Sequence, residues 1–185
     1  MTESKPRQNL PYLFLGLGLL LIVASALFIL RDVSLQSDFS TVPAQVNYPA
    51  PELTLTDLEG VTRSLADYRG QVVLVNLWAT WCEPCKKEMP TLAAYYNKHA
   101  DAGFTVIAIN DGDPQADVLQ FVKEYQLTFP VWLDPTYIAT EQAFKTIGLP
   151  SSYVIDRDGT VRLMWAGGIS RRMLDKHVTP FITEK

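Results

Sequence analysis

The chain has 185 residues, of which 48% are apolar and 11% aromatic, and its formal net charge is −4. This composition suffices for one domain with a sizeable core, and it excludes disorder along the whole chain. Without residues 1–31, 13 basic groups stand against 19 acidic groups. This excess of negative charge argues against nucleic acid as a partner.

Residues 11–30 are apolar almost throughout, and a helix needs about 20 such residues to cross the hydrocarbon layer. Lys5 and Arg7 precede this segment, so the positive-inside tendency favours a cytoplasmic N-terminus. We therefore expect a single-pass signal anchor in the cell membrane, with the catalytic domain outside the cytoplasm. A cleaved secretory signal ending at Ala24-Ser25-Ala26 is the alternative, and it gives the same compartment.

The order of segments predicts a tethered domain. Residues 1–10 form the cytoplasmic N-terminus, and residues 11–30 form the transmembrane anchor. Residues 31–50 contain polar residues and proline without an apolar period, which is typical of a linker. The folded domain is then expected to occupy residues 51–185.

Strand and helix patterns alternate within this domain. The predicted strands are 53–56, 61–64, 71–78, 105–110, 131–133, 152–156 and 161–166. The predicted helices are 84–100, 114–125, 137–144 and 170–182. The first two strands and the last two form hairpins, with glycine at each turn. The pattern predicts an α/β fold with an N-terminal β-hairpin and a central mixed β-sheet flanked by helices on both faces.

The only two cysteines, Cys82 and Cys85, follow an apolar strand and are separated by two residues. The free N–H groups and the dipole at the start of a helix favour a thiolate, so Cys82 is the predicted nucleophile. Cys85, inside the first turn, is the predicted resolving thiol of a redox-active disulfide. Glu83 opposes thiolate formation, whereas Lys86 and Lys87 favour it.

Two other uses of the cysteine pair fit the spacing less well. A purely structural disulfide would close so short a loop that it would restrict the unfolded chain little. A zinc site would need further ligands, and His177 lies far beyond the spacing of a zinc finger from His99. We therefore expect no metal and no cofactor.

Two motifs carry a family resemblance. Residues 78–90 read WATWCEPCKKEMP, and residues 148–153 read GLPSSY. From residue 51 to its end, the chain resembles the membrane-anchored thiol-disulfide oxidoreductases of the TlpA/ResA type, within the thioredoxin superfamily. The resemblance implies a thioredoxin-like fold with a central insertion at residues 113–134 that shapes partner choice. It also implies a cis Leu149–Pro150 peptide that faces the cysteines.

The resemblance also gives Glu88 a role. Glu88 lies one turn after Cys85 and matches the acidic residue that these relatives use near their thiols. We expect it to tune the pKa of Cys85 or to take its proton, and a solvated helix carboxylate is the alternative. Position 76 holds Asn, as in ResA-like proteins, where thioredoxins proper carry an acid. The residues expected to contact substrate are Trp81, Glu83, Pro84, Leu149 and Pro150.

These observations predict an extracytoplasmic enzyme that reduces disulfides in partner proteins. A Cys82 thiolate attacks the substrate disulfide, and Cys85 then resolves the mixed disulfide. The resemblance implies a membrane thiol-reductase as the electron donor, and apocytochrome c is the best-known kind of substrate in the family.

Two further functions remain open. A peroxiredoxin-like thiol peroxidase is one, although Ala79 stands where a peroxidatic site carries Thr. A non-enzymatic copper-binding assembly factor is the other, with Cys82, Cys85 and a distant histidine such as His177 as ligands. Related copper chaperones space their cysteines one residue wider.

Overall fold

The computed structural model describes residues 14, 18, 20–25 and 42–184. The chain divides into two units, Met1–Asp38 and Phe39–Lys185, and the fold below is that of the second unit. Within the described residues, no helix has the length and apolar character that crossing a membrane requires. The predicted N-terminus, most of the predicted anchor, and residues 31–41 of the predicted linker lie outside the described residues.

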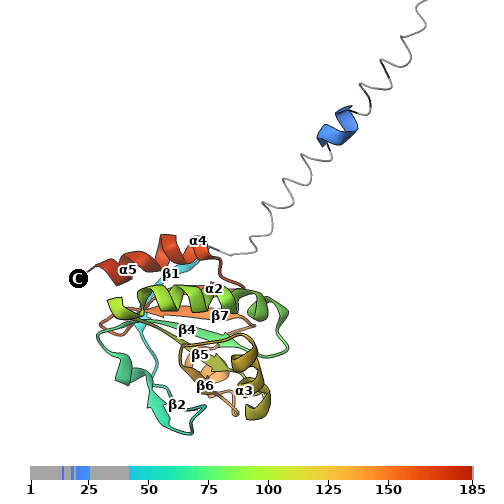
Figure 1. Ribbon diagram of the computed structural model, residues 1–185. Coiled ribbons are helices and arrows are strands. Elements are labelled where there is room, and N and C mark those ends of the chain that lie inside the picture. Colours follow the sequence, from blue (N-terminus) through green and yellow to red (C-terminus); the bar gives the residue numbers. More distant parts are fainter. Residues whose placement is uncertain (1–13, 15–17, 19, 26–41, 185) are drawn as a thin grey trace, which may run out of the picture. The chain divides into compact units, whose positions relative to one another are not determined.

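A mixed sheet of eight strands forms the centre of the Phe39–Lys185 unit (Figure 1). The strands are β1 (Ala44–Pro49), β2 (Thr54–Asp57), β3 (Thr62–Ser64), β4 (Val72–Trp78), β5 (Phe104–Asn110), β6 (Val131–Leu133), β7 (Ser151–Ile155) and β8 (Thr160–Ala166). Their order across the sheet is β1-β8-β7-β4-β5-β6-β2-β3. The strands β4, β5 and β6 run parallel, whereas β7 and β8 are antiparallel to their neighbours. The predicted central mixed sheet is therefore confirmed.

The helices also follow the predicted pattern. The longer ones are α2 (Glu83–His99) and α3 (Gln115–Glu124). The chain closes with α4 (Arg171–Met173), η4 (Leu174–Val178) and α5 (Thr179–Thr183), and the shorter turns are η1 (Leu65–Tyr68), η2 (Ala100–Ala102) and η3 (Ile138–Ala143). Two predicted helices, 137–144 and 170–182, contain the π-helical segments η3 and η4.

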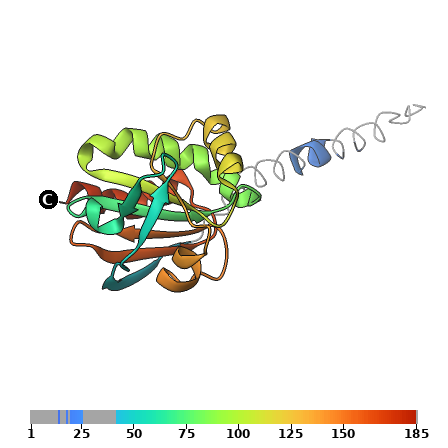
Figure 2. The ribbon, with the colours of Figure 1, turned by 90° about the horizontal axis from the view of Figure 1, so that it is seen from below.

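The two faces of the sheet are covered unequally. Alternate residues of β4 enter two separate apolar clusters, because successive side chains of a strand point to opposite faces. One cluster contains residues of α2, α3 and the closing helical segment, and the other contains residues of β2, η1 and η3. Figure 2 shows α2 and α3 on one side of the sheet and η3, in orange, on the other. The long helices therefore share one face, and short turns cover the opposite face.

The folded unit begins earlier than residue 51, so the predicted linker boundary is wrong. Strand β1 pairs antiparallel with β8, with Ala44 opposite Met164 and Pro49 opposite Thr160. Five of its six side chains are exposed, which leaves no alternating apolar pattern for sequence reasoning to detect. Residues 44–49 therefore belong to the sheet, because their backbone pairs with β8.

The predicted hairpin at one sheet edge and the predicted central insertion are both present. Strands β2 and β3 pair antiparallel, and Gly60 in their turn has a φ of 81°, which glycine adopts without a steric penalty. The insertion contributes α3 and β6, and β6 lies between β5 and β2. Because β4, β5 and β6 are parallel, the loops that follow them lie together at the carboxyl ends of these strands.

Candidate active site

The two cysteines lie where β4 leads into α2. Cys82 is the N-cap of α2, and its Sγ accepts a hydrogen bond from the N–H of Cys85 at 3.3 Å. The two sulfur atoms form a disulfide across Cα atoms 5.2 Å apart. Cys82 is 4% exposed and Cys85 is fully buried, an order that fits the predicted attacking and resolving roles. After reduction, the same N–H group can stabilise a thiolate on Cys82.

Three of the predicted substrate-contacting residues form the exposed rim of the dithiol. Trp81 is 69% exposed, an unusual position for so large an apolar side chain. Glu83 and Pro84 are also exposed, in the first turn of α2. The ammonium group of Lys86 lies 3.5 Å from a carboxylate oxygen of Glu83, and this surface pair moderates the charge that each presents to Cys82.

The Leu149–Pro150 peptide is cis, the isomer that the resemblance implied. Pro150 is buried and directly precedes β7, whose Ser151 lies opposite Leu77 of β4. Because β4 continues from there towards Cys82, the cis peptide and the cysteines lie at the same edge of the sheet. The carbonyl of Pro150 accepts a hydrogen bond from the N–H of Gly167 at 2.8 Å.

Glu88 is buried with 3% exposure, so the alternative of a solvated helix carboxylate is wrong. Its Oε1 accepts a hydrogen bond from Nδ2 of Asn76, and its Oε2 accepts one from the N–H of Ile169, each at 2.8 Å. Burial raises the pKa of Glu88 to about 7, against the lowering effect of these two hydrogen bonds. Residues three apart share a helix face, so a group that titrates near neutral pH lies on the same side of α2 as Cys85.

A short chain of buried polar groups extends from Glu88 into the sheet. The Nδ2 group of Asn76 also donates to Oγ of Ser152 at 2.9 Å, across the β4–β7 register that pairs these two residues. Oδ1 of Asn76 is buried and has no hydrogen-bond partner among the described residues. Sequence reasoning singled out Asn76 but missed Ser152, although its position two residues after the predicted cis-proline is a usable signal.

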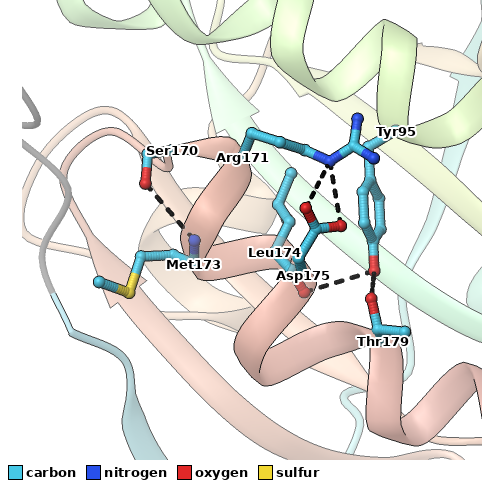
Figure 3. Close-up of polar contacts among 7 residues, drawn as sticks. All are labelled: Tyr95, Ser170, Arg171, Met173, Leu174, Asp175 and Thr179. Carbon is cyan, nitrogen blue, oxygen red and sulfur yellow. Dashed lines mark hydrogen bonds and ion pairs between the residues drawn. The ribbon is translucent and has the colours of Figure 1, made fainter.

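The turn that supplies Ile169 leads directly into the closing helical segment, and this segment contacts Tyr95 of α2 (Figure 3). The hydroxyl of Tyr95 on α2 lies 2.9 Å from Oγ1 of Thr179, and the guanidinium of Arg171 lies 5.4 Å from the centre of the Tyr95 ring. Arg171 also donates to both carboxylate oxygens of Asp175. These contacts hold the turn in place, and with it the N–H group that binds the buried carboxylate.

A second loop holds the residues just before Cys82. The N–H of Thr80 donates to Oδ2 of Asp113 at 2.6 Å, and Nδ2 of Asn110 donates to the same oxygen at 2.8 Å. Asp113 in turn donates its own N–H to Oδ1 of Asn110 at 3.0 Å. Sequence reasoning missed Asn110 and Asp113. The available signal was that polar residues at the carboxyl ends of neighbouring parallel strands meet at one edge.

The described residues contain no group of three His, Cys, Asp or Glu side chains that could hold a metal ion. His177 is therefore not assembled with Cys82 and Cys85 into a three-ligand site. Its ring lies edge-on to Trp165, with 6.4 Å between ring centres.

The sequence is similar to known proteins over most of the folded unit. The profile of the AhpC/TSA family matches residues 46–164. The thiol-disulfide oxidoreductase ResA of Geobacillus kaustophilus is 35% identical over 133 residues, which cover 72% of this chain and 76% of the relative. The chain belongs to the AhpC/TSA family, as a ResA-type thiol-disulfide oxidoreductase. ResA of Bacillus subtilis is likewise 35% identical over 129 residues, covering 70% of this chain and 72% of the relative.

Solved structures agree with this family assignment. A thiol:disulfide interchange protein of the thioredoxin family from Chlorobium tepidum gives a TM-score of 0.66 at 28% identity, covering 75% of this chain and 99% of that chain. The thioredoxin domain of a thiol-disulfide oxidoreductase from Bacteroides vulgatus gives 0.68 at 26% identity, covering 76% and 100%. The fold of this ResA-type enzyme is therefore thioredoxin-like, and the Cys82–Cys85 disulfide is its redox centre.

Proposed function

We propose that this ResA-type enzyme works outside the cytoplasm, anchored by residues 11–30, as a reductant of disulfides in partner proteins. We infer the direction of electron flow from the buried Glu88, whose pKa is about 7. A carboxylate beside the dithiol repels a thiolate and so destabilises the charged form of the reduced pair. A dithiol whose reduced form is destabilised gives up its electrons more readily.

Each step of the proposed reaction is assigned to Cys82, Cys85 or Glu88. The Cys82 thiolate attacks one sulfur of the substrate disulfide, and the other substrate sulfur leaves as a thiolate and takes up a proton. Glu88 then accepts the proton of Cys85, whose sulfur attacks Sγ of Cys82 and releases the second substrate thiolate. The substrate gains two electrons, and the enzyme ends with the Cys82–Cys85 disulfide. Two electrons from a donor must then restore the dithiol.

The sequence supports the rest of the proposal. Lys5 and Arg7 before the apolar segment favour an extracytoplasmic catalytic domain. The resemblance to TlpA/ResA proteins supports a membrane thiol-reductase as the electron donor and apocytochrome c as a substrate. The peroxidase alternative is weakened because Ala79 is fully buried and offers no hydroxyl group to a peroxide.

The decisive experiment is to trap the substrate with Cys85→Ser in the native host. This variant can form the mixed disulfide through Cys82 but cannot resolve it, so a disulfide-linked partner should accumulate on non-reducing gels. Cys82→Ser is the matched control and should capture none. The proposal is overturned if Cys85→Ser captures no partner and the wild-type chain reduces no protein disulfide. Digestion of the domain by protease in intact spheroplasts tests its location, and full protection would contradict it.

A further inference from the structure

A hollow of about 270 Å³ lies beside the dithiol, between the start of α2 and α3, which both ribbon views place next to each other (Figures 1 and 2). We call it the α2–α3 groove. Thr80 and Lys86 line it on the dithiol side, and Asp117, Gln120 and Glu124 line it on α3, with Tyr125 directly after this helix. Thr80 precedes Cys82 by two residues, and Lys86 directly follows Cys85. A polypeptide bound at the dithiol can therefore continue into this groove.

The floor of the groove is aromatic and firmly packed. Phe121 is buried there, and its ring stacks on Tyr125 with 4.1 Å between ring centres and 7° between ring planes. Phe121 also packs against the fully buried Trp78, with 4.6 Å between ring centres. The floor therefore belongs to the core of the enzyme, and the groove can receive a segment without rearrangement of α3.

The charge of the groove is negative. Asp117 and Glu124 are exposed on the face of α3 that lines it, and neither belongs to an ion pair among the described residues. Lys86 is the basic residue of the lining, and its ammonium group is already 3.5 Å from the carboxylate of Glu83. Lys123 of α3 does not line the groove.

We infer that the α2–α3 groove docks a positively charged stretch of the substrate polypeptide, next to the disulfide that Cys82 attacks. The carboxylates of Asp117 and Glu124 attract Lys and Arg side chains, which raises the rate of encounter and disfavours acidic segments. The aromatic floor accepts the apolar stems of the same side chains. This inference rests on the proposed function, because it names the substrates that the reduced dithiol selects.

The test compares two synthetic disulfide peptides of equal length, one with four Lys beside its cysteine and one with four Glu. The full chain, reduced and held in neutral detergent, should reduce the Lys peptide with a kcat/KM about tenfold higher at low salt. The preference should shrink to less than about twofold at 1 M salt, where the screening length is about 3 Å. Asp117→Lys combined with Glu124→Lys should abolish or reverse the preference.

The matched control is Glu52→Lys combined with Asp101→Lys, which reverses two exposed charges outside the groove and should keep the preference. If the groove variant misfolds, Asp117→Asn with Glu124→Gln replaces it and should lose most of the preference. The inference is wrong if the wild type treats both peptides alike or if the groove variant keeps the wild-type ratio. Failure of the proposed function looks different, because the wild type would then reduce neither peptide.

Discussion

The inner and outer sides of the dithiol differ in their contact with solvent. The inner side consists of Glu88, Asn76 and Ser152, all buried and joined by hydrogen bonds. The outer side consists of the exposed Trp81 rim and the α2–α3 groove. A low-dielectric interior shifts proton affinity strongly, whereas an exposed surface contributes contacts and steering. In the proposed function and docking mode, proton chemistry and partner choice therefore depend on separate groups of residues.

The largest effect should appear in the stability of the oxidised protein, through the inner side. The pKa of Glu88 is about 7 in the folded state, whereas that of an unperturbed glutamate side chain is 4.5. Between these values the folded state holds more protons than the unfolded state, so stability is fully present below about pH 4.5 and falls as pH rises through 7. The loss should approach roughly 3 kcal/mol in the free energy of unfolding.

Urea unfolding of the oxidised protein at pH 4.5 and pH 8 checks this expectation, with Glu88→Gln as the variant that should remove most of the difference. Glu83→Gln lies on the same helix but is exposed, and it should leave the pH dependence unchanged. An equal pH dependence in wild type and Glu88→Gln would assign the effect to other groups.

The next effect should be kinetic. Glu88→Gln cannot accept the proton of Cys85, so resolution of the mixed disulfide at pH 7 should slow by about 10²-fold. The wild-type resolution rate should rise with pH through an inflection near 7, the pKa of Glu88, and the variant should lack this inflection. Stopped-flow measurement of release from a preformed mixed disulfide reports this step. The same inflection in Glu88→Gln would break the assignment of proton transfer to the inner side.

The smallest effect should come from the Asp113 loop, which holds Thr80 of the α2–α3 groove on the outer side. Asp113→Ala removes the acceptor of the Thr80 N–H and should lower the free energy of unfolding by about 1 kcal/mol. Asp113→Asn keeps an acceptor oxygen and should lower it less, and Glu124→Ala, an exposed control on α3, should stay within about 0.5 kcal/mol of wild type. Denaturant unfolding at pH 7 measures all three. A changed pH profile of resolution in Asp113→Ala would show that the two sides are coupled.

Sequence patterns predicted the parts of the fold that bury apolar side chains. Strand β4 is buried along its whole length, so its run of apolar residues marked it, and the cysteine motif marked the start of α2. Strand β1 was not predicted, because its side chains are largely exposed. Its pairing with β8 depends on backbone groups, which every residue except proline has in the same form. Register and backbone pairing become visible only when the strands are assembled.

The same distinction applies to the site. Cys82, Cys85 and Glu88 are close in sequence at the start of one helix. Spacing related the two cysteines, and the family resemblance added Glu88. Ile169 acts on Glu88 through its backbone N–H from 81 residues away, and its apolar side chain gives no hint of that role. Asn110 is the last residue of β5 and Asp113 follows in the loop, and neither shows a role until the parallel pairing of β4 and β5 brings them to Thr80.

The turn between β8 and α4 has a practical consequence for engineering. Its Gly167 N–H binds the carbonyl of Pro150, and its Ile169 N–H binds the carboxylate of Glu88. A designer who moves the WCEPC motif and Glu88 into another thioredoxin-like scaffold would leave both donors behind. The pKa of the transplanted glutamate would then differ, because the Ile169 N–H that binds its carboxylate belongs to a distant part of the chain. Grafting this chemistry therefore means grafting three segments: β4 with the start of α2, the Pro150 segment before β7, and the β8–α4 turn.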